Sequence, residues 1–175
     1  MTSKLDTAAN VATIIAATGL IATLAVAAWH PVAQPKREQL RVGGPAPALA
    51  GVNFNRAKKT LVMVIRHDCK PCADSMAFYR QLPPPVPLTG DATLERQFVA
   101  VALDDPKTAR DYVKSNGLKV NAVIAYAQDK QDKLGVAGTP TLVLVDNMGI
   151  VRKIWLGRLD SKHQAEVMAE LNSST

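Results

Sequence analysis

The chain has 175 residues, of which 47% are hydrophobic and 21% are charged, and its formal net charge is +6. This length predicts one compact domain with an appended segment, and the hydrophobic content excludes a wholly disordered chain. Its two cysteines are too few for a disulfide scaffold or a four-cysteine zinc site, and its three histidines are too scattered for a zincin motif. The lysines and arginines are dispersed along the sequence, so we expect no nucleic-acid partner.

The N-terminal segment differs from the rest of the chain in hydropathy. No charged residue lies between Ala8 and Trp29, and about 20 apolar residues span a bilayer core as a helix. Trp29 lies where an interfacial aromatic side chain would be. The length favours a transmembrane anchor over residues 1–30, with the membrane as its partner. The alternative is a secretory signal peptide, with Lys4 in its charged region and a cleavage site at Ala25-Val26-Ala27.

Residues 31–41 are predicted to form a linker, and residues 42–175 a folded domain, because prolines interrupt the chain after the apolar run. The basic residues of this stretch are Lys36, Arg37 and Arg41. A simple count of positive charges would keep the domain in the cytoplasm, although long domains are translocated largely regardless of charge. The charges therefore leave the topology open.

The folded domain alternates between strand and helix patterns. Continuous β-branched and apolar runs predict strands at 60–66, 97–103, 120–125, 141–146 and 150–156. Helices are predicted at 71–82, 106–116, 129–134 and 161–171, the last with Ser161 as its N-cap. The residues available for the buried face of the first helix are Ala73, Met76, Ala77, Tyr79 and Leu82. This order, with a hairpin turn at 147–149, predicts an α/β domain with a mixed sheet flanked by helices.

The segment Cys69-Lys70-Pro71-Cys72 lies between the first predicted strand and the helix after it. Two cysteines at this spacing can form a disulfide across the first helical turn. The helix dipole and Lys70 favour a thiolate at Cys69, while Pro71 stiffens the turn. We predict that Cys69 is the nucleophile and that Cys72 resolves the mixed disulfide. A lone C-x-x-C also fits a structural disulfide or half of a metal site, but its place in a βαβ pattern favours redox chemistry.

A second motif, Thr139-Pro140, comes just before the predicted strand 141–146. Proline cannot donate to a strand ladder, so we expect Pro140 at the first position of that strand. An ordinary turn proline is the alternative.

Together these motifs resemble the membrane-tethered TlpA/ResA type of thiol–disulfide oxidoreductases, which have a thioredoxin-like fold. The resemblance covers residues 42–171 and is carried by the segments 42–47, 69–72, 134–141 and 145–151. It implies that the Thr139–Pro140 bond is cis, which costs a proline only about 0.5–1 kcal/mol. It also implies that Thr139 and Pro140 bind the substrate chain, with hydrogen bonds from the backbone of Thr139.

The same resemblance implies the partners and the compartment. They are protein thiols or disulfides as substrates and a membrane or soluble electron donor, with neither cofactor nor metal. We expect a single-pass protein of the inner (cytoplasmic) membrane whose domain faces the periplasm or the outside.

Two positions depart from the family pattern. Asp68 stands where tryptophan is usual, and its carboxylate is expected to raise the pKa of the neighbouring thiol. Met63 stands where thioredoxins carry a buried carboxylate, and it cannot relay a proton. An acid–base role could then pass to His67, or to Asp104 or Asp105; for His67 the alternative is a partly exposed loop histidine.

The leading hypothesis is a membrane-anchored thiol–disulfide oxidoreductase that acts as a reductant through Cys69 and Cys72. The alternative is a copper-binding metallochaperone that uses the two cysteines and His163, although the copper-delivery branch usually has three residues between its cysteines. A peroxiredoxin would need threonine where Arg66 stands. A scaffold without activity is disfavoured because both cysteines and Pro140 are intact.

Overall fold

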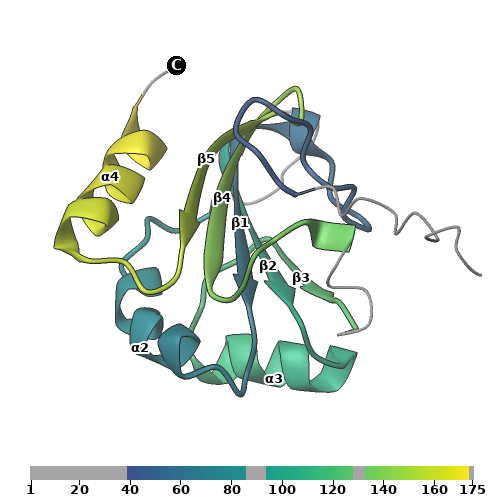
Figure 1. The fold of residues 1–175 in the computed structure, drawn as a ribbon, viewed down its shortest axis with the longest axis vertical. Helices are drawn as coiled ribbons and strands as arrows, with labels where there is room; N and C mark the ends of the chain where they lie inside the picture. Colours follow the sequence, from purple (N-terminus) through teal and green to yellow (C-terminus); the bar gives the residue numbers. More distant parts are fainter. Residues whose placement is uncertain (1–38, 86–93, 128–132, 174–175) are drawn as a thin grey trace, which may run out of the picture. The chain divides into compact units, whose positions relative to one another are not determined.

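The computed structural model describes residues 39–85, 94–127 and 133–173 (Figure 1). The predicted anchor, most of the predicted linker and most of the predicted helix 129–134 lie outside the described residues. Within the described ranges, no helix is long and apolar enough to cross a membrane.

A five-stranded mixed sheet forms the centre of the domain, with the strand order β3-β2-β1-β4-β5 (Figure 1). The strands are β1 (Ala57–Ile65), β2 (Leu94–Ala102), β3 (Ala122–Ala125), β4 (Thr141–Asp146) and β5 (Val151–Leu156). β1 is parallel to β2, and β2 to β3, whereas β4 is antiparallel to both β1 and β5. The predicted mixed α/β sheet is therefore confirmed.

β1 starts earlier than the apolar run predicts. Lys58 and Lys59 interrupt that run in the sequence, but both belong to the strand, and Ala57 before them is fully buried. Along the rest of β1, successive side chains point to opposite faces, as they must in a strand. Leu61 and Met63 belong to the core on one face, and Val62 and Val64 to the core on the other. The strand is buried on both faces, as predicted.

One face of the sheet carries the α-helices of the described chain. They are α2 (Lys70–Tyr79), α3 (Pro106–Ser115) and α4 (Ser161–Asn172). Buried side chains from all three helices belong to the same apolar cluster as Leu61 and Met63. Burying a large apolar side chain contributes about 1.5–3 kcal/mol, so this cluster holds the helices on the sheet.

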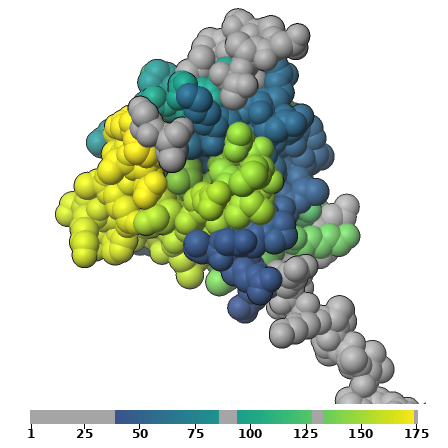
Figure 2. Space-filling view, turned by 90° about the horizontal axis from the view of Figure 1, so that it is seen from above, coloured from purple at the N-terminus to yellow at the C-terminus, as the bar shows by residue number. Residues whose placement is uncertain are grey.

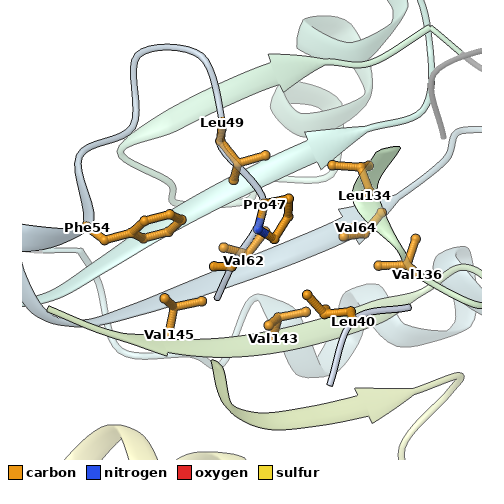
Figure 3. A pocket seen from close by; sticks show the side chains of 11 residues that line it. Leu40, Pro47, Leu49, Phe54, Val62, Val64, Leu134, Val136, Val143 and Val145 are labelled. Carbon is orange, nitrogen blue, oxygen red and sulfur yellow. The ribbon is translucent and has the colours of Figure 1, made fainter. Parts of the chain in front are cut away.

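The opposite face is covered by the segment 40–54 and by Leu134 rather than by one of these helices. This segment ends in the short 3-10 helix η1 (Phe54–Arg56). Its side chains point towards valines of β1 and β4 and enclose a small apolar void with them (Figure 3). The void lies in the core, away from the polar groups described below.

The segment 40–54 is joined to the β4–β5 hairpin by backbone hydrogen bonds, and the two lie against each other on one surface (Figure 2). The N–H of Gly43 donates to the carbonyl of Val151 at 2.8 Å, and the N–H of Val151 donates to Gly44 at 2.9 Å. Gly43 has φ +82°, a conformation that favours glycine. These bonds satisfy the outer backbone edge of β5 at Val151.

Two details of the predicted helices are wrong. In α2, Ala73 and Ala77 are exposed, while Ser75 and Phe78 are buried. The helix starts at Lys70 with Cys72 fully buried, and the positions three and four residues beyond Cys72 share its face.

In α4, the N-cap is Asp160 rather than Ser161. The carboxylate of Asp160 accepts a hydrogen bond from the N–H of His163 at 2.8 Å. Ser161 is already inside the helix, and its hydroxyl does not make this capping bond.

Candidate redox site

Cys69 and Cys72 form a disulfide across the start of α2. Cys69 is the N-cap of this helix, and the N–H of Cys72 lies 3.2 Å from its Sγ as a donor. Pro71 lies in the first turn, where its missing N–H costs no helical hydrogen bond. Cys69 is 7% exposed and Cys72 is fully buried. Of the two sulfurs, that of Cys69 is therefore the one a substrate can reach.

The Thr139–Pro140 peptide bond is cis, as the resemblance implies. β4 begins one residue later, at Thr141, so Pro140 precedes the strand rather than opening it. The carbonyl of Pro140 accepts from the N–H of Gly157 at 2.7 Å, and the hydroxyl of Thr141 donates to the carbonyl of Gly138 at 2.6 Å. Both bonds fix this loop at the end of the sheet that carries the cysteines.

Thr139 contacts the more exposed sulfur directly. Its hydroxyl donates to Cys69 Sγ at 3.4 Å, and its carbonyl oxygen lies 3.5 Å from the same sulfur. In the reduced protein, the hydroxyl of Thr139 and the N–H of Cys72 would both donate to a Cys69 thiolate, and donors to the charged form favour it. The family resemblance implied only backbone hydrogen bonds from Thr139. The signal for its side-chain contact was the hydroxyl residue directly before Pro140.

The charged residues around the pair are themselves paired. Asp68 forms an ion pair with Arg66, and Lys70 lies 3.5 Å from Asp74, four residues further along α2. The side chain of Lys70 is 87% exposed. We expect Arg66 to weaken the effect that Asp68 has on the thiol, and Asp74 and solvent to weaken that of Lys70.

His67 and Asp104 are brought together, while Asp105 is not part of this contact. Asp104 Oδ1 lies 2.5 Å from Nδ1 of His67, and its Oδ2 accepts from the backbone N–H of His67 at 3.1 Å. The hydrogen bond to Asp104 raises the pKa of His67 above its usual 6.5. Asp105 instead caps α3, accepting from the N–H groups of Lys107 and Thr108.

Met63 lies in the apolar core beneath the pair, 2% exposed and in the same cluster as both cysteines. No carboxylate replaces it on this part of β1.

Within the described part of the chain, no group of three or more His, Cys, Asp or Glu side chains is arranged to hold a metal ion. His163, the third ligand of the copper hypothesis, lies in α4, where Nδ1 is 2.7 Å from Asp160 Oδ1. The structure does not bring it to the cysteines.

No family model and no curated protein matches the chain. Solved structures do match it. A thiol:disulfide interchange protein from Bacteroides sp. is 17% identical, with 78% of this chain and 93% of that chain covered and a TM-score of 0.56. The thioredoxin domain of a thiol-disulfide oxidoreductase from Bacteroides vulgatus is 18% identical, with coverages of 77% and 100% and a TM-score of 0.54. The chain has a thioredoxin-like fold.

A third similar structure, a thioredoxin-family thiol:disulfide interchange protein from Chlorobium tepidum, gives a TM-score of 0.53 at 19% identity, with coverages of 75% and 96%. The thioredoxin-like fold includes both the mixed sheet and the helix α2, which Cys69 caps. At these identities the likeness concerns the fold, so the chemistry has to be derived from the chain's own residues.

Proposed function

We propose that this chain is a thiol–disulfide oxidoreductase that exchanges disulfides with protein substrates through Cys69 and Cys72. The observation that carries the proposal is the contact between the Cys69 sulfur, at the start of α2, and Thr139 of the cis Thr139–Pro140 bond. A structural disulfide would need neither a reachable sulfur nor a hydroxyl donor aimed at it. The apolar run between Ala8 and Trp29 would anchor the chain in the inner membrane, with the domain facing the periplasm or the outside.

Exchange would proceed in two steps. The Cys69 thiolate attacks one sulfur of a substrate disulfide, which forms a mixed disulfide and releases the other substrate sulfur as a thiolate that takes a proton from solvent. Cys72 then loses its proton and attacks Cys69 Sγ. The second substrate sulfur leaves, the Cys69–Cys72 disulfide closes, and two electrons have passed to the substrate. A thiol electron donor would restore the dithiol by the reverse exchange.

The charge balance favours action as a reductant. A strongly oxidising disulfide requires a strongly stabilised thiolate in its reduced form. Here the cation of Lys70 is exposed and lies beside Asp74, and Arg66 is paired with Asp68. Because both cations already lie beside carboxylates, neither supplies that stabilisation in full. The substrate polypeptide would lie along the backbone of Thr139, with Pro140 beneath it.

The test is turnover of a protein disulfide. The full chain, kept reduced by dithiothreitol, is expected to accelerate the reduction of insulin. Cys69→Ser should abolish the acceleration, whereas Cys72→Ser should accumulate a mixed disulfide on Cys69. Equilibration with glutathione buffers then gives the potential, and a strongly negative value supports a reductant. A couple that never cycles, or a tight one-to-one Cu(I) complex of a chain that does not turn over, would overturn the proposal.

A further inference from the structure

A single buried carboxylate holds the loop that leads into the cysteine pair. Asp104 lies two residues beyond the end of β2, and its side chain is only 4% exposed. Both of its oxygens are bound to one residue of the loop: Oδ2 to the backbone N–H of His67, and Oδ1 to the imidazole. The N–H of Leu103 also donates to the carbonyl of Ile65 at 2.9 Å. The clasp of Asp104 on His67 therefore fixes both the backbone and the ring.

The backbone held in this way is close to that of the reactive cysteine. His67 precedes Cys69 by two residues, and since consecutive α-carbons are ~3.8 Å apart, their α-carbons are separated by less than ~8 Å. Asp104 engages Nδ1, which leaves Nε2 free, and the side chain of His67 is 52% exposed. Protons can therefore reach the ring from solvent while its position stays fixed.

The other charged groups around this clasp are paired with one another or lie at its border. Arg66 and Asp68 on the loop form an ion pair, and so do Lys70 and Asp74 on α2. On α3, burial and then the nearby Asp104 raise the pKa of Tyr112, whose hydroxyl stays neutral. Three further ionisable groups, Asp105, Tyr126 and Lys133, line the surface hollow that Asp104 also borders. When His67 loses its proton, the net charge of the His67–Asp104 pair changes from zero to negative.

We propose that Asp104 is a positioning residue of the redox centre: it holds the imidazole of His67 as a titratable charge beside Cys69, and this charge sets how readily Cys69 forms a thiolate. The inference rests on the proposed function. When His67 is protonated, the clasp carries no net charge, and the Cys69 thiol loses its proton to solvent more easily. When His67 is neutral, the Asp104 carboxylate opposes the thiolate. The centre is therefore more reducing above the pKa of His67 than below it.

Alkylation by iodoacetamide tests this in the full chain carrying Cys72→Ser, where Cys69 is the single thiol. At about pH 6, His67→Gln leaves Asp104 unneutralised and should slow alkylation about 3- to 10-fold, the size expected for one charge at this range. Asp104→Asn removes the negative charge and should accelerate it. Asp105→Asn is the matched control, because it removes the same charge one residue further on, where the side chain caps α3; its rate should stay within about twofold.

The opposite signs separate tuning from simple loosening of the loop. If Asp104→Asn slows alkylation as His67→Gln does, or if His67→Gln matches the unchanged chain at about pH 6, the proposal is overturned.

Linkage offers a second readout, because coupling between two sites is reciprocal. The pKa of His67, followed by NMR of its ring, should be higher in the reduced full chain, where a thiolate forms, than in the oxidised one. Equal values in the two states would contradict the coupling.

Neither measurement needs a protein substrate. Failed insulin turnover with intact coupling would refute the proposed function alone, and intact turnover without coupling would refute this inference alone.

Discussion

Thr139 provides the hydrogen bond that can be removed with the least disturbance of the sulfur. Thr139→Val keeps the shape of the side chain and deletes the hydroxyl that lies 3.4 Å from Cys69 Sγ. A hydrogen bond to a charged group is worth about 1.5–3 kcal/mol, and about 1 kcal/mol when it is long and partly exposed. We therefore expect the pKa of the Cys69 thiol to rise and the thiolate fraction near neutrality to fall about fivefold. The pH dependence of thiolate absorbance in the full chain measures this.

Thr141→Val is the matched control for that substitution. Thr141 is 2% exposed, and its hydroxyl donates to the carbonyl of Gly138 at 2.6 Å rather than to the sulfur. Its loss should lower the free energy of unfolding by about 1–3 kcal/mol, because a buried acceptor loses its partner, while the thiol pKa stays unchanged. A thiol pKa that moves equally in both variants, or in neither, would show that the Thr139 hydroxyl has no special role.

At the scale of the element, the β4–β5 hairpin depends on one carboxylate where its turn begins. Asp146 accepts from the N–H groups of Met148 and Ile150, both at 2.9 Å, and from the guanidinium of Arg152. Burial acts to raise the pKa of Asp146, but these donors outweigh it and lower the pKa below its usual 3.8. The stability this gives is present above the unfolded pKa and is lost as the pH falls through the folded one.

Asp146→Asn should therefore lower the free energy of unfolding by about 1 kcal/mol at neutral pH. The difference from the unchanged chain should shrink as the pH falls below about 4, where protonation removes the charge of Asp146 in the unchanged chain too. Denaturant titration of the full chain at several pH values measures this. Asp111→Asn, which removes an exposed carboxylate paired with Lys107, should leave stability unchanged. Identical behaviour of the two variants would exclude a role for Asp146 in holding the turn.

The C-terminal end of α4 is bound to the sheet by Lys59. Its ammonium group donates to the carbonyls of Glu170 and Ser173 at 2.7 and 2.6 Å. A cation at this end of a helix satisfies carbonyls that lack helical partners and interacts favourably with the dipole. Lys59→Met should lower the melting temperature and reduce the free energy of unfolding by about 1–2 kcal/mol. Lys58→Met is its control, since Lys58 only pairs with exposed Glu95, and it should change little; equal losses would contradict the prediction.

The elements themselves could largely be predicted from sequence, because each depends on local pattern. The continuous apolar run of β1 and the proline at the start of α3 lie where the patterns placed them. One error occurs where a tertiary contact decides, and another where a local contact decides the start of a helix. Lys59 can lie within a strand because carbonyls at the end of α4 accept hydrogen bonds from its ammonium group. Asp160 rather than Ser161 caps α4 because its carboxylate accepts from the N–H of His163.

At the scale of the whole molecule, the site depends on the register of the sheet. Ile65 at the end of β1 lies beside Ala102 at the end of parallel β2, and Val64 lies beside Thr141 at the start of antiparallel β4. This register brings Asp104 to His67 and Thr139 to Cys69. The spacing of the cysteines and the Thr-Pro dipeptide could be read from the sequence. For the acid–base role, the sequence left a choice among His67, Asp104 and Asp105. It did not predict the contact between His67 and Asp104, which are 37 positions apart.

The N-terminal run gives the prediction that concerns the whole chain. If the segment from Ala8 to Trp29 is a retained anchor, the full chain should stay with the membrane fraction after alkaline extraction, because burial of about 20 apolar residues in a bilayer is effectively irreversible. If it is a signal peptide cut after Ala27, the mature chain should be shorter and released. A chain lacking residues 8–29 is the control and should be soluble and uncleaved. A full chain that is uncleaved and is nevertheless released from the membrane fraction would contradict both hypotheses. A reporter fused at the C-terminus tests the topology: it would report a cytoplasmic domain if the basic residues after Trp29 set the orientation.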